Sequence, residues 1–158
     1  MLNGVRKENH MQAIRKYVPT AARLFLGLAF TVFGLNFFLH FLPMPAAPPR
    51  AAAFAGALFA SGYLFPLLKA TEVVAGLLLL SGFFVPLVLA VLAPILINIV
   101  GFHLFLEPSG LPLPLVMLAA EIYLARTYRA AFAPMLHLRT PLPAQADGAE
   151  RSPVHLAA

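Results

Sequence analysis

Residues 63–82 read YLFPLLKATEVVAGLLLLSG, an almost uninterrupted apolar run. A helix needs about 20 mostly apolar residues to cross the hydrocarbon core of a bilayer, and this run is long enough. Lys69 and Glu72 lie three positions apart inside it, so they would share one face of such a helix. The stretch predicts a membrane-spanning helix that carries a base and an acid at membrane depth.

The composition of the whole chain agrees with a membrane protein. Of 158 residues, 61% are hydrophobic and 11% are charged, against roughly 25% charged residues in soluble domains. The chain has no cysteine, which excludes disulfides, thiolate nucleophiles and cysteine-ligated metals. It also lacks a phosphate-binding glycine-rich loop, a nucleophile elbow and a nucleotide-binding fingerprint. These features indicate one compact membrane domain without a familiar soluble catalytic motif.

Four windows are suited to span a bilayer. None shows the alternation of a transmembrane β-strand, and helices are the other way to satisfy backbone groups in hydrocarbon. The predicted fold is an all-α transmembrane four-helix bundle with helices at 24–42, 63–82, 85–106 and 111–128.

Proline- and glycine-containing stretches separate these windows: PMPAAPPR (43–50), SGFFVP (81–86, a tight turn) and EPSGLP (107–112). Between the first and second spans, AAAFAGALFASG predicts a short interfacial helix. We expect a basic cytoplasmic segment at 1–20, the membrane domain at 21–133 and a disordered cytoplasmic tail at 134–158.

Basic residues outside the spans gather at the two ends of the chain. Arg50 is the exception, and it lies in a loop on the opposite side of the predicted membrane. The positive-inside rule therefore predicts that both termini are cytoplasmic in a multi-pass protein of the plasma membrane. Topology accounts for the net charge of +5, so no nucleic-acid partner is expected. The flanking basic residues are Arg6, Lys7, Arg15, Lys16 and Arg23 before the first span, and Arg126, Arg129, Arg139 and Arg151 at or beyond the fourth.

Strongly polar residues inside the spans all fall in the outer half of the predicted membrane. Facing lipid would cost several kcal/mol at the bilayer centre, so we expect them to face the bundle interior as a polar chamber open toward the outer leaflet. Helix rise gives depths of roughly 13 Å for Glu72, 12 Å for Asn98 and Glu121, 9 Å for Asn36 and Lys69, and 3 to 5 Å for His40 and His103.

These residues allow a functional and a structural interpretation. In the functional one, Glu72 or Glu121 handles a proton, and Lys69, Asn36 or Asn98 polarises a ligand oxygen, with His40 and His103 nearer the rim. In the structural one, Lys69 forms an ion pair with either acid and the other side chains hold helices together. No tight spacing of histidines and acids predicts a metal site.

The first and third spans resemble each other around NFFLHFLP (36–43) and NIVGFHLFLEP (98–108). The second and fourth correspond loosely, with Glu72 matching Glu121. One interpretation is a two-helix duplication whose halves are related by an axis along the membrane normal. Chance similarity between leucine-rich helices is the other.

Across 21–133, the chain resembles the DoxX family of small four-helix membrane proteins. The resemblance lies in Gly-Leu-Asn-x-Phe at 34–38, Lys-x-x-Glu-x-x-x-Gly at 69–76, and Asn98 followed by Phe-His-Leu-Phe-Leu at 102–106. It implies an accessory role in membrane oxidoreductase complexes, including quinone-linked oxidation of sulfur compounds. Related proteins that act on thiols use cysteines, which are missing here, so this chain cannot itself exchange disulfides.

Two classes of function and a structural role follow. The first is an accessory subunit, partnered by oxidoreductase subunits in the lipid bilayer, that binds a quinone or similar amphiphile in the polar chamber. The second is a transporter or sensor of a small polar molecule, which would require a homo-oligomer because one bundle offers little room. The third is a non-catalytic membrane scaffold. The sequence does not decide whether the protein is an enzyme.

Overall fold

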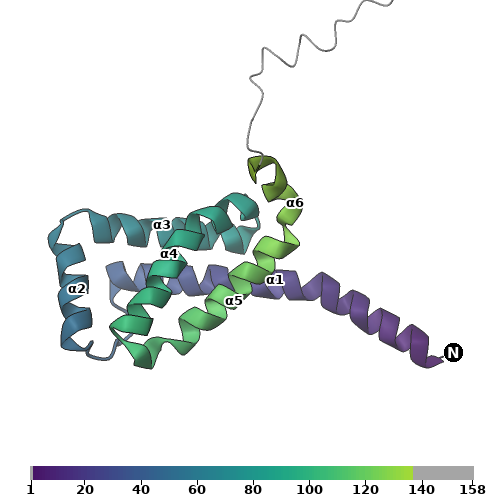
Figure 1. Cartoon of the computed structure of the whole chain (residues 1–158), viewed down its shortest axis with the longest axis horizontal. Helices are drawn as coiled ribbons and strands as arrows, with labels where there is room; N and C mark the ends of the chain where they lie inside the picture. Colours follow the sequence, from purple (N-terminus) through teal and green to yellow (C-terminus); the bar gives the residue numbers. More distant parts are fainter. Residues whose placement is uncertain (1, 137–158) are drawn as a thin grey trace, which may run out of the picture. The chain divides into compact units, whose positions relative to one another are not determined.

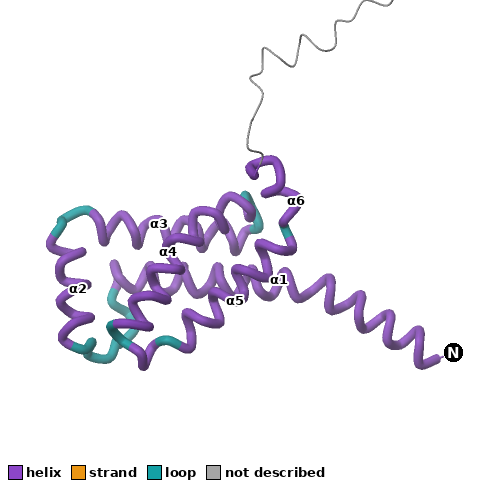
Figure 2. Tube along the Cα trace, viewed as in Figure 1, coloured by secondary structure: helices purple, strands orange, loops and turns teal. Residues whose placement is uncertain are grey.

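The computed structural model describes residues 2–136, and the side chains of residues 17–135. Within this range the backbone is helix, turn or loop and contains no strand (Figure 2). The predicted all-α class is confirmed for this part of the chain. The predicted disordered tail, 134–158, lies almost wholly outside the described residues.

Five helices make up the first compact unit of the chain, which ends at Tyr128. They are α1 (Leu2–Leu39), α2 (Pro49–Ala60), α3 (Leu64–Ser81), α4 (Val85–Phe105) and α5 (Pro112–Thr127), with a short 3₁₀ turn, η1 (Pro108–Gly110), before α5. The second unit begins at Arg129 and contains α6 (Arg129–Phe132) and the 3₁₀ turn η2 (Ala133–Leu136).

Three helical segments are long and apolar enough to cross a membrane. They are Tyr17–Leu39 of α1, the whole of α3 and the whole of α4. The helix α5 has 16 residues and is not one of the three. The membrane character of the chain is therefore carried by α1, α3 and α4, and the fourth span stays a prediction.

The helix α1 differs at both ends from the window 24–42. It begins at Leu2, and the polar stretch before the apolar window contains Arg, Lys, Gln and Met, which favour helix. It ends at Leu39 because His40 adopts the left-handed conformation, with φ of 51°. The apolar composition continues beyond the helical backbone here, so hydropathy alone misplaced the end.

The connection between α3 and α4 is the tight turn expected from the sequence. Gly82 adopts a φ of 83°, and its N–H donates to the carbonyl of Leu78 at 3.0 Å. The N–H of Phe83 donates to the same carbonyl at 3.1 Å. Glycine is suited to this left-handed position, so the chain reverses its direction directly after the apolar run.

The core lies where α1, α3, α4 and α5 meet. The helix α1 packs against α3 and α5, and α4 packs against the same two helices (Figure 1). Glycine brings α1 and α3 close: a Cβ at Gly76 would lie 2.7 Å from the backbone nitrogen of Thr31 and 2.8 Å from the carbonyl oxygen of Gly27. The fully buried side chains include Leu26, Phe30, Leu79, Leu92, Leu96 and Leu124.

The short helix α2 runs across one end of this cluster, between the end of α1 and the start of α3 (Figure 1). Aromatic rings hold it there. The ring centroids of Phe59 and Phe37 of α1 are 6.4 Å apart, and those of Phe54 and Phe102 of α4 are 5.9 Å apart. Phe37 also contacts Phe65 of α3 at 4.8 Å. The predicted short helix is therefore present, and its position relative to a membrane stays a prediction.

Candidate functional site: acids buried among the helices

Lys69 and Glu72 form an ion pair on the buried side of α3. The Lys69 Nζ donates to both carboxylate oxygens of Glu72 at 2.9 Å. Glu72 is 1% exposed, and the Lys69 Nζ also lies 5.7 Å from the centroid of the Phe65 ring. Each charge of the pair is therefore compensated within one turn of helix. An ammonium group has three protons, so one remains for another acceptor.

Glu121 is the second buried acid, and it differs from Glu72. It is 5% exposed, and it follows Pro114 and Met117 on the buried stripe of α5. Both of its carboxyl oxygens are buried without a hydrogen-bond partner in the described part of the chain. Lys69 pairs with Glu72 and not with Glu121. A buried carboxyl group without partners is costly unless it is protonated or receives a donor from another molecule.

Asn36 forms a local link at the end of α1. Its carboxamide oxygen accepts the N–H of Leu42 at 2.6 Å, and its amide nitrogen donates to the carbonyl of Leu42 at 3.4 Å. Asn36 is 8% exposed, whereas His40, in the loop that it closes, is exposed. Asn36, which the sequence predicts as a ligand contact, is thus already hydrogen-bonded to the loop that follows α1.

His103 belongs to a second local cluster, at the end of α4. Its Nδ1 lies 3.3 Å from a carboxylate oxygen of Glu107 and 3.3 Å from the Glu107 carbonyl. A Cβ at Gly110 would lie 2.6 Å from the His103 ring, so any larger residue there would have to displace the ring. Among the described residues, no group of three or more His, Asp or Glu side chains is placed to hold a metal ion.

The expectation that Asn98 faces the bundle interior is wrong for the single chain. Asn98 is exposed, and its amide nitrogen donates to the carbonyl of Pro94 of the same helix at 2.9 Å. The helix α4 buries the stripe that contains Val88, Leu92 and Leu96, and Asn98 lies on another face. The position of Asn98 in the sequence indicates its depth in the membrane. It does not indicate which way the side chain faces, because α4 is apolar on nearly every side.

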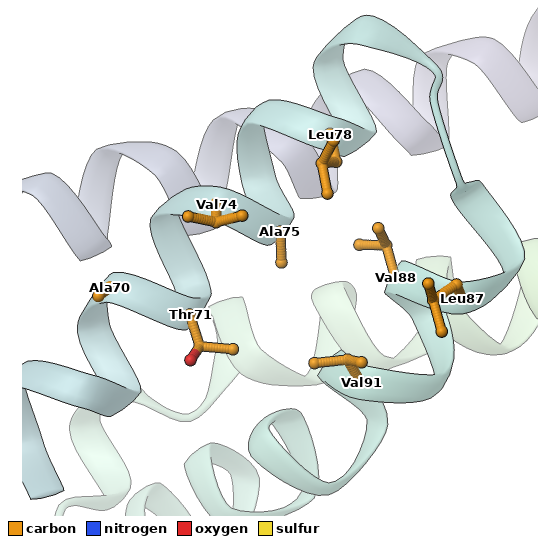
Figure 3. A pocket seen from close by; sticks show the side chains of 8 residues that line it. All are labelled: Ala70, Thr71, Val74, Ala75, Leu78, Leu87, Val88 and Val91. Carbon is orange, nitrogen blue, oxygen red and sulfur yellow. The ribbon is translucent and has the colours of Figure 1, made fainter.

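An open apolar groove of about 340 Å³ lies between α3 and α4 (Figure 3). None of the polar residues predicted for the chamber lines it. Its only polar side chain, Thr71, donates its hydroxyl to the Leu67 carbonyl at 2.9 Å. The groove is therefore distinct from the predicted polar chamber. Its lining consists of Ala70, Thr71, Val74, Ala75, Leu78, Leu87, Val88 and Val91.

Arg23 has a structural contact that the sequence interpretation missed. Its guanidinium group donates to the carbonyl of Leu79, and to that of Leu80 at 3.1 Å, at the C-terminal end of α3. The last carbonyls of a helix lack partners within the helix and attract a cation. Its position at the start of an apolar window predicts only a role in membrane topology. The contact with α3 is not visible in the local sequence, because the partner carbonyl is more than fifty residues away along the chain.

Together these observations define the class: an all-helical protein with three helices able to span a membrane and two acids buried between them. Comparisons with protein-family models, with curated proteins and with solved structures gave no match.

Proposed function

We propose that the chain is a DoxX-like multi-pass protein of the plasma membrane. In this proposal α1, α3, α4 and α5 form a four-helix transmembrane bundle, both termini are cytoplasmic, and α2 lies at the outer interface. Support comes from the closed order of contacts, in which each of the four helices packs against two others. The clustering of basic residues at both chain ends supports this orientation.

The proposed function is that of an accessory subunit of a membrane oxidoreductase system, which binds a quinone or a similar amphiphile among the four helices. The observation that carries this proposal is Glu121, whose two carboxyl oxygens are buried without a partner in the described chain. A ligand that donates an O–H group would satisfy such a carboxylate, and a ligand carbonyl would satisfy its protonated form. The unpartnered carboxyl group therefore fits the hydrogen-bonding of a quinone head group.

The side chains would have different tasks. Glu121 would hold a proton at a carboxyl oxygen, because no group in the described part of the chain forms a hydrogen bond there. Lys69 would offer its remaining proton to a ligand oxygen, since two are used by Glu72. Glu72 would keep Lys69 in place and compensate its charge. A quinone, when bound, supplies two-electron and two-proton redox chemistry.

The test is to identify small molecules retained by the full chain in lipid nanodiscs. Wild type, Glu121→Gln and the control Glu107→Gln are purified in parallel, and bound amphiphiles are measured by mass spectrometry. Loss of a hydrogen bond to a charged group predicts roughly tenfold less quinone in Glu121→Gln. The control should match wild type because Glu107 already has partners in a local cluster. Equal retention in all three proteins, or none in any, would contradict the proposal.

A scaffold is the second candidate, and a specific observation favours it. Asn36, Lys69 and Glu72 each have hydrogen-bond partners within the chain, as expected if polar residues only lock helices together. In that case, the nanodisc preparation would contain a partner protein and no bound amphiphile. Glu121→Gln would leave that partner bound.

A further inference from the structure

Asn98 is a carboxamide of the spanning helices that its own chain leaves exposed. The three candidate spans lie wholly within the described residues, and their other strongly polar groups are covered and paired. Glu72 and Asn36 are buried, Lys69 and His103 are 17% and 19% exposed beside a carboxylate, and Arg23 caps α3. Asn98 is exposed near the middle of α4. A carboxamide facing hydrocarbon is unfavourable, so this face of α4 requires a polar partner.

The carboxamide of Asn98 is half satisfied. Its nitrogen donates to the carbonyl of Pro94 at 2.9 Å, which uses one of two donor protons. In the described chain its oxygen accepts no hydrogen bond. One donor proton and one acceptor oxygen therefore remain, and they point to a partner that offers the same pair of groups. A second carboxamide does so.

The surroundings of Asn98 suit another helix. Residues on this face of α4 recur at alternating intervals of four and three positions. This is the spacing at which two helices pack along the seam of a left-handed coiled coil. A Cβ at Gly101 would have nothing within 4 Å, so a second backbone has room to approach one turn from Asn98. The seam consists of Leu87, Val91, Pro94, Asn98, Gly101 and Phe105.

We propose that α4 pairs with α4 of a second copy of this chain. Two copies inserted in the same orientation are related by a twofold axis along the membrane normal, so the two helices run parallel. The axis then brings each residue near its own counterpart at equal depth. Asn98 donates to and accepts from the other Asn98, and a single asparagine at such a seam sets its register. The groove of Figure 3, which shares Leu87 and Val91 with the seam, extends this contact toward α3.

The absence of cysteine makes the seam directly testable. Val91→Cys and Gly101→Cys place one thiol each on the seam, and Leu28→Cys and Val116→Cys place one on α1 and α5, where each native side chain is 57% exposed. Full-length variants are oxidised in native membranes and separated without reductant. Disulfide-linked dimers are expected for the two seam variants and not for the controls. The proposal would be overturned if the controls cross-linked to the same extent as the seam variants, or if no variant cross-linked at all.

A second measurement isolates the amide pair. Energy transfer between labelled full-length chains in liposomes gives the dimer dissociation constant. Asn98→Leu should weaken the dimer roughly tenfold, the order expected for an interhelical amide pair in a membrane. Asn98→Gln, which keeps the amide, should weaken it less. An unchanged dissociation constant in Asn98→Leu would reject the amide pair, and a chain that stays monomeric at every lipid ratio would reject the dimer.

This inference rests on α4 lying in the bilayer and is independent of any ligand at Glu121. The two proposals therefore fail separately. Asn98→Leu should leave the quinone content of the nanodisc preparation unchanged, whereas Glu121→Gln should leave seam cross-linking unchanged.

Discussion

At the scale of single residues, Lys69 and Glu72 show how a charge is accommodated within a spanning helix. Their spacing of three positions joins the ammonium group to both carboxylate oxygens at 2.9 Å, so neither charge is left isolated. Glu121 has no such neighbour. The two acids thus have opposite characters: one is neutralised by its own helix and the other is open to a ligand or a proton.

The ion pair gives a stability prediction. Glu72→Leu leaves the Lys69 ammonium without its counter-charge, and breaking a buried pair in this way costs about 3 to 5 kcal/mol. Adding Lys69→Met should recover most of the lost free energy of unfolding, because no charge then remains. The measurement is chemical unfolding in mixed micelles. The nearly isosteric Glu72→Gln removes the charge but keeps an acceptor oxygen for Lys69, so it should be less destabilised than Glu72→Leu. A double variant as unstable as Glu72→Leu alone would reject this account.

At the scale of helices, the contact between α1 and α3 depends on small side chains. Gly27, Thr31 and Gly34 of α1 face Gly76 and the backbone near Lys69 and Leu80 of α3. The distances are short enough that the two backbones touch. Such packing replaces the hydrophobic effect, which cannot drive association between helices already in lipid.

Gly76→Ala tests this contact. The added methyl group would lie 2.7 Å from the Thr31 nitrogen, so the helices must separate, and overpacking of this kind costs about 1 to 3 kcal/mol. Gly56→Ala is the matched control, because nothing lies within 4 Å of its Cβ and alanine favours helix by about 1 kcal/mol. The midpoint of thermal unfolding should fall for the first variant and stay level or rise for the second. A smaller effect at Gly76 than at Gly56 would contradict the close contact.

At the scale of the whole molecule, the proposed orientation follows from the distribution of basic residues. The loop between α4 and α5 and the helix α2 would lie outside, and the turn between α3 and α4 would lie in the cytoplasm. Arg23, which caps the end of α3 near this turn, would be at the cytoplasmic side. The structure supplies the connectivity, and charge supplies the direction.

Thiol labelling in intact cells tests the orientation. Ser109→Cys, between α4 and α5, should react with a membrane-impermeant maleimide from outside. Ser81→Cys, at the end of α3, should react only after the cells are permeabilised. The chain without added thiols is the background control, since it contains no cysteine. Labelling of position 81 alone in intact cells would invert the proposed topology.

The sequence by itself determined the helical class, the limits of α3 and α4 to within a residue, and the turn between them. It could do so because long apolar runs without the alternation of a β-strand satisfy their backbone in a membrane as helices, and Gly82 permits the left-handed turn that ends α3. The burial of Glu72 and Glu121 also follows the depth argument, and their chemical roles stay predictions.

Only the tertiary structure decided the rotation of each helix and its long-range partners. Asn98 lies on an exposed face of α4, Asn36 is engaged with Leu42, and Arg23 caps a distant helix. The physical reason is that α4 is apolar around nearly its whole circumference, so no amphipathic pattern marks its buried side. Side-chain packing between helices decides which face of α4 is buried. The spacing of residues along the sequence does not specify that face.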